Sequence, residues 1–357
     1  MNTLNPDIFF TFFIIIIFIV SLILYKLFIY FSHSFGVREY QKIETNRWNP
    51  NYKPSVGGFV FYIVFLFTVI LGTLIFGISS PEKIKILGAW GSATIAFFMG
   101  FADDSFNTQP VVKSISQISC ALLLILTGTY IHLFENNLLN HFITIFWVVG
   151  IMNSINMLDN MDGIAGSTAL YILSFIALVM YQLNTNIFAL NFLIVSGLCV
   201  SLIAFLLFNF YPSTIFMGDT GSQFLGLILS YTGIEYIWNL PKMNNDFYSY
   251  LYVFLLIALI YLILLIDTTT VTINRLLAGG SPFVGGKDHT THFLWKRVKS
   301  ERKVFYLFSI IQLISLFIAY QLIFNYSPKW FYIGILYSLI CFLFLYLNTK
   351  LFVSEKD

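Results

Sequence analysis

Residues Ile8–Phe31 read IFFTFFIIIIFIVSLILYKLFIYF, an apolar stretch interrupted by a single charged residue, Lys26. A helix needs about 20 consecutive apolar residues to cross the hydrocarbon core of a bilayer. This stretch is long enough to do so. It has no basic segment before it and no small-residue cleavage pattern after it, so we expect a retained membrane helix rather than a signal peptide.

Apolar runs of similar length recur along the rest of the chain. Of 357 residues, 58% are hydrophobic and 10% are charged, whereas soluble domains carry about 25% charged residues. Backbone groups inside lipid must hydrogen-bond internally, which makes helices the expected structure. We therefore predict an all-α polytopic membrane protein with about 10 to 11 transmembrane helices in one domain over residues 1–357. The candidate spans are 8–31, 56–78, 86–102, 111–131, 142–158, 165–182, 188–208, 222–238, 248–267, 304–325 and 330–348.

Composition also excludes several classes of protein. The formal net charge of +2 is too small for nucleic-acid binding, which needs a strongly basic field. Cys120, Cys199 and Cys341 lie inside apolar runs without paired or metal-type spacing, so we expect buried thiols. The chain has no Walker-type loop and no dinucleotide-binding glycine fingerprint, which leaves an ATP-driven pump or a Rossmann enzyme without support.

The loop charges predict an orientation, because loops on the cytoplasmic side of a membrane are enriched in Lys and Arg. With the amino terminus outside, the outside loops hold only Lys83, Lys85, Lys242 and Lys329. The inside segments then hold Arg38, Lys42, Arg47, Lys53, Lys113, Arg275, Lys287, Lys296, Arg297, Lys299, Arg302, Lys303, Lys350 and Lys356. We therefore expect a cytoplasmic carboxyl terminus, and a functional site on the cytoplasmic side, where the carboxylates at helix ends gather.

The first polar group on that side is the pair Asp103 and Asp104, followed by Lys113. Adjacent carboxylates at the end of an apolar helix repel each other and lose hydration unless a cation or a basic group neutralises them. A divalent metal ion is the partner that we expect. The alternative is an ordinary solvated loop after a helix, which the pair alone does not exclude.

The second group follows a regular spacing. Asn153, Asn156 and Asp159 recur every three residues, so they lie roughly along one side of a helix. Asp162-Gly163 then ends the helix and adds a carboxylate to the loop. This polar stripe indicates either a binding site or a contact that holds two membrane helices together.

The third group places Asp219 between Gly218 and Thr220-Gly221 at the start of a helix. Exposed N–H groups at a helix N-terminus suit a phosphate, and the carboxylate suits a metal ion shared with that phosphate. The alternative is a turn in which Asp219 or Thr220 only caps the helix that follows.

The fourth group is a glycine-rich loop over 279–286 that leads to His289 and His292. Two His three residues apart, near Lys and Arg, can bind phosphates, stabilise a leaving group or ligate a metal. A pair of solvated His residues is the alternative.

Together the four groups describe a nucleoside-diphosphate site beside lipid: carboxylates for a metal, glycine turns and basic groups for phosphates, and amide or aromatic groups for a base. The rival class is an ion-coupled secondary transporter, which predicts acidic groups near the bilayer midplane and symmetry between the halves of the chain. A lipid-binding scaffold without catalysis would not require so many carboxylates.

The ordered motifs from Lys53-Pro54-Ser55-Val56-Gly57-Gly58 to His292 resemble those of the polyprenyl-phosphate N-acetylhexosamine-1-phosphate transferase family. The resemblance implies transfer of a sugar-1-phosphate, such as N-acetylglucosamine-1-phosphate, from a UDP-sugar to undecaprenyl phosphate with release of UMP. It also implies a multi-pass protein of the bacterial inner membrane, in contact with membrane lipids, and it leaves room for a homodimer. A second branch of the family makes lipid I from UDP-N-acetylmuramoyl-pentapeptide and is the alternative.

The resemblance also implies a role for each candidate residue. Asp103 would activate the lipid phosphate, Asp219 would bind magnesium, and Phe216 would stack on uracil. The implied catalytic residues are Asp103, Asp104, Asn156, Asp159, His289 and His292. The implied substrate-binding residues are Lys53, Lys113, Asn153, Asp162, Asn209 and Phe216. The implied metal ligands are Asp219, Asp103 and Asp104, for Mg²⁺ or alternatively Mn²⁺.

The chain departs from the family pattern at two places. Asn160 stands where a glycine is common, and Thr291 and Phe293 stand where His is common. The second departure puts the separate roles of the two His residues in doubt. Ser281-Pro282-Phe283 looks more like the branch that uses UDP-N-acetylglucosamine than the lipid I branch.

Overall fold

The computed structural model describes residues 6–31, 53–76, 80–183, 190–240, 247–281, 286 and 288–353. These residues form an all-α bundle, and the β-structure among them is an isolated bridge between Ser55 and Phe216. The helices are α1 (Pro6–Phe31), α2 (Gly57–Phe76), α3 (Ser80–Phe106), α4 (Pro110–Leu126), α5 (Asn137–Leu158), α6 (Ile164–Gln182), α7 (Leu190–Asn209), α8 (Gly218–Gly233), α9 (Phe247–Ile260), α10 (Leu262–Leu277), α11 (Thr290–Val298), α12 (Glu301–Phe324) and α13 (Pro328–Val353), with a π-helical turn, η2 (Ile234–Trp238), after α8.

The prediction of an all-α membrane protein is confirmed. Within the described ranges, eight helices are long and apolar enough to cross a membrane, and the pair α9–α10 also qualifies if it is counted as one broken span. Each predicted span overlaps a helix. The count is lower than 10 to 11 because α4 and α8 have only 17 and 16 residues.

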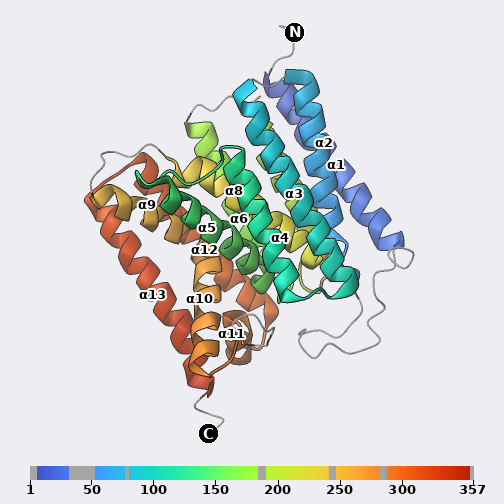
Figure 1. The fold of residues 1–357 in the computed structure, drawn as a ribbon. Coiled ribbons are helices and arrows are strands. Elements are labelled where there is room, and N and C mark those ends of the chain that lie inside the picture. The colour runs from blue at the N-terminus through green and yellow to red at the C-terminus, as the bar shows by residue number, and fades with distance from the viewer. Residues whose placement is uncertain are drawn as a thin grey trace.

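The predicted span 248–267 is wrong as a single straight helix. α9 ends at Ile260, α10 begins at Leu262, and the two helices meet at 87° (Figure 1). Gln312 of α12 binds the backbone groups freed at the break: its Nε2 donates to the Ile260 carbonyl at 2.8 Å, and its Oε1 accepts from the Ile263 N–H at 3.3 Å. Such side-chain bonds allow a helix to break inside a membrane protein.

Local sequence signals set several helix starts. Pro110 opens α4, where its missing N–H costs nothing. Asn136 precedes α5, and its side chain accepts the N–H groups of Leu138 and Leu139. Ser300 caps the N-terminus of α12 in the same way, because its hydroxyl accepts a hydrogen bond from the Lys303 N–H.

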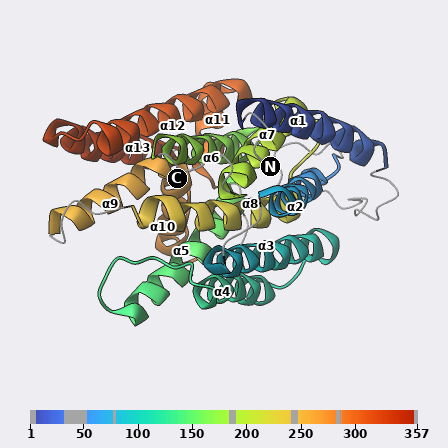
Figure 2. The ribbon, with the colours of Figure 1, turned by 90° about the horizontal axis from the view of Figure 1, so that it is seen from above.

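α8 lies at the centre of the bundle, packed against α2, α3, α5 and α6 (Figure 2). Two glycines permit this close packing. A Cβ added to Gly58 of α2 would collide with the backbone of Gly221, and one added to Gly100 of α3 would collide with the backbone of Asp219 and Thr220. Backbone therefore meets backbone at the start of α8, and the end of α3 is brought next to Asp219.

Candidate active site

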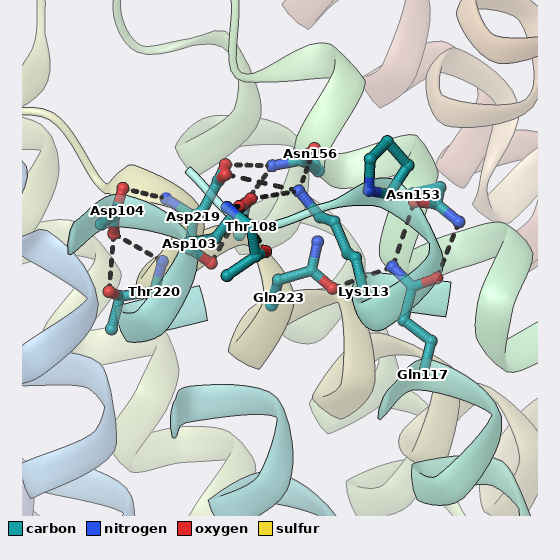
Figure 3. A network of polar contacts seen from close by, with 12 residues as sticks. Asp103, Asp104, Thr108, Lys113, Gln117, Asn153, Asn156, Asp219, Thr220 and Gln223 are labelled. Carbon is teal, nitrogen blue, oxygen red and sulfur yellow. Dashed lines mark hydrogen bonds and ion pairs between the residues drawn. The ribbon is translucent and has the colours of Figure 1, made fainter. Parts of the chain in front are cut away.

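Four helices converge on the ammonium group of Lys113 (Figure 3). Its Nζ, from α4, lies 2.9 Å from Oδ2 of Asp103 on α3, 3.2 Å from Oδ1 of Asn156 on α5, and 3.3 Å from Oδ2 of Asp219 on α8. The Lys113 side chain is largely buried. One cation therefore holds together two carboxylates and an amide that lie far apart in the sequence.

Further hydrogen bonds orient these carboxylates. Oδ1 of Asp103 accepts from the backbone N–H of Thr108 at 2.8 Å and from its hydroxyl at 2.7 Å. The amide of Asn156 donates to Oδ1 of Asp219 and, at 2.9 Å, to the hydroxyl of Ser222. The predicted proximity of Asn156 to the acidic residues is thus present in the structure.

Asn153 lies in an adjoining amide network. Its side chain exchanges two hydrogen bonds with Gln117, each 3.0 Å long, and Gln117 also donates to Oε1 of Gln223 at 3.0 Å. These bonds join α4, α5 and α8. The structure thus shows Asn153 in the helix-joining role that was the alternative for the polar stripe, and its binding of substrate stays a prediction.

Asp104 points away from the cluster and caps α8. Its Oδ1 accepts from the Asp219 N–H at 3.0 Å, and its Oδ2 accepts from the N–H and hydroxyl of Thr220 at 2.8 and 2.6 Å. A carboxylate at this helix end also complements the helix dipole. Among the described residues no group of three His, Cys, Asp or Glu is arranged to hold a metal. The structure therefore shows Asp104 as a cap of α8, and its predicted role as a metal ligand together with Asp103 and Asp219 stays a prediction.

The chemistry of the remaining donors fits magnesium. Mg²⁺ is commonly held by one or two carboxylates together with water and substrate phosphates, and the cluster offers the carboxylates of Asp103 and Asp219 beside the amide oxygen of Asn156. Asp219 lies outside the eight candidate spans. Burial raises the pKa of Asp219 to about 7, and its hydrogen bond with Asp103 acts in the same direction, while Lys113 opposes both. An added cation would favour the ionised form of Asp219.

A second group brings together three of the residues predicted to bind substrate: Lys53, Asp162 and Phe216. Nζ of Lys53 lies 3.3 Å from Oδ2 of Asp162, 2.8 Å from Oγ of Ser213, and 5.0 Å from the centre of the Phe216 ring. The Ser213 N–H also donates to Asp162 at 3.0 Å. A cation, a carboxylate and an aromatic ring thus meet, although they come from three separate segments.

Two backbone contacts hold this second group in place. The segment before α2 pairs with the loop before α8, through bonds from the Gly57 N–H to the Phe216 carbonyl and from the Phe216 N–H to the Pro54 carbonyl, both 3.0 Å. Asn209 joins the same loop to the start of α6: its Oδ1 accepts from the Gly163 N–H, and its Nδ2 donates to the Ile215 carbonyl. The structure therefore shows Asn209 supporting the site, and direct contact with substrate remains a prediction.

A third group surrounds the predicted His pair at the start of α11. Nδ1 of His289 lies 2.9 Å from Oδ2 of Asp267, and the rings of His289 and His292 have centres 5.5 Å apart. Asp159 follows the last residue of α5, and the next residue, Asn160, accepts a hydrogen bond from the Thr291 hydroxyl.

Several predicted loop residues lie outside the described residues, namely Arg38, Lys42, Arg47, Lys242, 282–285, Lys287 and Lys356.

Comparison with known proteins finds one similar family and several similar relatives. The model of Glycosyl transferase family 4 matches residues 86–237. A probable undecaprenyl-phosphate N-acetylglucosaminyl 1-phosphate transferase of Bacillus subtilis (strain 168) is 28% identical over 316 residues, which cover 85% of this chain and 82% of the relative. A phospho-N-acetylmuramoyl-pentapeptide-transferase of Clostridium perfringens (strain 13 / Type A) is 27% identical over 331 residues, or 86% and 96% of the two chains. The central part of the chain, residues 86–237, is thus similar to glycosyl transferase family 4, and the two relatives extend the similarity over most of the chain.

The match to glycosyl transferase family 4 covers the centre of the site. Residues 86–237 include Asp103, Lys113, Asn156 and Asp219. Lys53 and the His pair lie outside the matched range. The structure nevertheless joins Lys53 to Asp162, and the start of α11 to Asn160, within that range.

Sequence reasoning missed several residues that orient the site. Thr108, Ser213 and Ser222 bind the carboxylates or amides described above, and Asp267 binds His289. Small hydroxyl residues are common in loops and carry little signal. Asp267 was visible as a carboxylate at the end of the predicted span 248–267, and an acidic residue in a membrane segment is a functional candidate.

Proposed function

We propose that this chain is a phosphoglycosyl transferase, moving a sugar-1-phosphate from a UDP-sugar to a polyprenyl phosphate and releasing UMP. The observation that carries the proposal is the Lys113 cluster, in which a buried cation joins Asp103 and Asp219 where four helices of a membrane protein meet. The match of residues 86–237 to glycosyl transferase family 4 supports the same activity. So do the relatives named as a probable undecaprenyl-phosphate N-acetylglucosaminyl 1-phosphate transferase and a phospho-N-acetylmuramoyl-pentapeptide-transferase.

The proposed sugar is N-acetylglucosamine or a related N-acetylhexosamine, and the proposed lipid is undecaprenyl phosphate. The Bacillus subtilis relative, which is named for both, supports this choice. Lipid I synthesis from UDP-N-acetylmuramoyl-pentapeptide is the second candidate, because the Clostridium perfringens relative, named as a phospho-N-acetylmuramoyl-pentapeptide-transferase, matches along 96% of its length.

A magnesium ion, with manganese as the alternative, is part of the proposal. When bound, such an ion neutralises charge on a diphosphate and on the departing UMP. Asp103 and Asp219 would hold it. Lys113 supplies positive charge beside them, and phosphoryl transfer relies chiefly on positioning and charge neutralisation.

The other groups would position the two substrates. Phe216 presents an aromatic ring for stacking on uracil, and Asp162 presents a carboxylate that can accept hydrogen bonds from the nucleoside. Asp103 would activate the lipid phosphate, which is already an anionic nucleophile. We therefore favour direct attack by the lipid over a covalent aspartyl intermediate.

The proposed location is the bacterial inner membrane, with the site on the cytoplasmic side and the amino terminus outside. The described ends of α1 and α13 support an odd number of crossings, because α1 begins and α13 ends at opposite ends of the bundle (Figure 1). The distribution of loop Lys and Arg then favours a cytoplasmic carboxyl terminus.

A secondary transporter fits the site less well. That class predicts carboxylates near the bilayer midplane, whereas Asp103 lies in the last turn of α3 and Asp219 in the first turn of α8. The acidic cluster is therefore at helix ends.

Purified protein incubated with undecaprenyl phosphate, magnesium and a panel of UDP-sugars tests the proposal. We expect UMP release with one UDP-N-acetylhexosamine and a lipid-linked sugar phosphate identified by mass spectrometry. Absence of UMP release with every donor, from folded protein in the presence of lipid, would exclude the proposed activity.

A further inference from the structure

A buried carboxylate on α10, Asp267, binds the two residues that open the His segment. Its side chain is 1% exposed. Oδ2 lies 2.9 Å from Nδ1 of His289, while Oδ1 accepts from the Thr290 N–H at 2.9 Å and from the Thr290 hydroxyl at 2.6 Å. Burying a carboxylate is costly unless it is fully hydrogen-bonded, and here all of these partners come from His289 and Thr290.

α10 holds the same segment at a second point. Arg275 lies about two turns beyond Asp267 along the helix. It forms a two-bond ion pair with Asp288, with Nε 2.7 Å from Oδ2 and Nη2 2.7 Å from Oδ1. Residues 288–290 are therefore fixed along α10.

A third contact joins the segment to the candidate site. The Thr291 hydroxyl donates to Oδ1 of Asn160 at 2.7 Å, and Asn160 lies in the turn between α5 and α6 that also carries Asp162. α5 itself carries Asn156, which binds Asp219. His289 is thus held beside the elements that carry Asn156 of the Lys113 cluster and Asp162 of the second group.

The bonds to Asp267 determine which nitrogen of His289 carries a proton. Both donors of Thr290 point at Oδ1, and an ionised carboxylate can only accept hydrogen bonds. The proton of the short contact between Oδ2 and Nδ1 must therefore sit on Nδ1. The hydrogen bond at one ring nitrogen sets the role of the other, so Nε2 becomes the atom available to a ligand.

We propose that Asp267 is a positioning residue, which holds His289 with Nδ1 protonated so that Nε2 faces the diphosphate of the UDP-sugar. The identity of that ligand rests on the proposed function. The protonation of His289 does not, because it follows from the contacts with Asp267 and Thr290 alone.

Asp267→Asn is a near-isosteric test of this role. Because Oδ1 receives two donors, the amide oxygen takes that place and the amide NH₂ faces Nδ1 of His289. The ring must then accept at Nδ1 and carry its proton on Nε2. The chain has five His residues, so ¹⁵N-histidine labelling gives a simple NMR spectrum in which two-bond ¹⁵N–¹H correlations distinguish the two forms. His289→Gln assigns the signal.

We expect Nδ1 of His289 to be protonated in the unmodified protein and unprotonated in Asp267→Asn. The kcat for UMP release should fall roughly 10²- to 10³-fold, as when one preorganised hydrogen-bonding group is misdirected, with KM for the UDP-sugar much less affected. Thr291→Val is the matched control, because it removes the third contact on the same helix and should leave the protonation of His289 unchanged.

Three outcomes would overturn the proposal. The first is an unprotonated Nδ1 in the unmodified protein, which decides the matter even if Asp267→Asn does not fold. The second is a changed protonation state without a fall in kcat. The third is a fall in kcat without a changed protonation state, which marks loss of structure. If no UDP-sugar is turned over, the proposed function fails, and the NMR result still decides whether Asp267 sets the protonation of His289.

Discussion

At the scale of single residues, Lys113 decides whether the acidic cluster can exist. Asp103 and Asp219 come from different helices and would repel each other, and the Lys113 ammonium lies within 3.3 Å of both. A carboxylate buried without a partner is unfavourable by several kcal/mol. The cluster is therefore a single electrostatic unit, in which the loss of one member changes the others.

Lys113→Met tests this unit. Removing the charge leaves two facing carboxylates, so we expect kcat for UMP release to fall roughly 10²- to 10³-fold. Lys85→Met is the matched control, because Lys85 pairs with Glu235 at 3.0 Å near the opposite end of α3. The control should keep near-normal turnover. Equal losses in the two variants would show that Lys113 contributes only to folding.

Asp104→Asn tests the capping role. One of the two Asp104 oxygens would become an NH₂ group facing a backbone N–H of α8, so we expect a loss of about 1 to 3 kcal/mol in stability, measured as a lower Tm. Thr220→Val removes only the hydroxyl bond to Asp104 and should cost less. An unchanged Tm together with weakened metal binding would instead support the predicted role of Asp104 as a metal ligand.

The two adjacent carboxylates also show a limit of sequence reasoning at this scale. Asp103 and Asp104 occur together at a helix end, and nothing local distinguishes a residue that points at Lys113 from one that caps α8. Their neighbours in the fold decide: Asp103 contacts Lys113, ten residues away, whereas the partners of Asp104 on α8 lie more than a hundred residues away. The structure places Asp103 and Asp219 beside Lys113 and places Asp104 at the start of α8, an arrangement that the sequence alone did not distinguish.

At the scale of helices, close packing of α3 against the start of α8 sets the geometry. Gly100 and Gly58 leave no room for a side chain at this contact. The break between α9 and α10 is a second feature that depends on helix packing. The sequence around Tyr261 contains neither Pro nor Gly, so it does not predict the break. Its cause is tertiary, since Gln312 of α12 binds the freed backbone groups.

Gly100→Ala tests the contact between α3 and α8. The new methyl group meets the backbone of Asp219 and Thr220, which cannot rotate away, and overpacking of this kind costs about 1 to 3 kcal/mol. We expect a lower Tm and reduced UMP release. Gly150→Ala on α5 is the control, because a Cβ there meets nothing within 4 Å. If both variants behave alike, the close approach does not matter for activity.

At the scale of the whole molecule, apolar run length was enough to predict the all-α membrane fold and to place a helix in each predicted span. Spacing alone could not show that Lys53, Asp162 and Phe216 meet, because the parallel contact of Ser55 with Phe216 joins segments far apart in the chain. Asp267 was overlooked because it closes the predicted span 248–267 and resembled a helix boundary. Long-range contacts thus account for what the local patterns left undetermined.

The helix bundle brings Asp103 and Asp219 together around Lys113. The proposed requirement for a metal ion at these carboxylates can be tested directly. The most direct measurement is the rate of UMP release against magnesium concentration, with undecaprenyl phosphate and the preferred UDP-sugar, for the unmodified protein and for Asp219→Asn. We expect release to require the cation and to saturate with it, and Asp219→Asn to be slower by roughly 10²-fold or more while its Tm shows a folded protein. Full turnover in excess chelator, or near-normal turnover by Asp219→Asn, would contradict the assignment of this cluster as the catalytic centre.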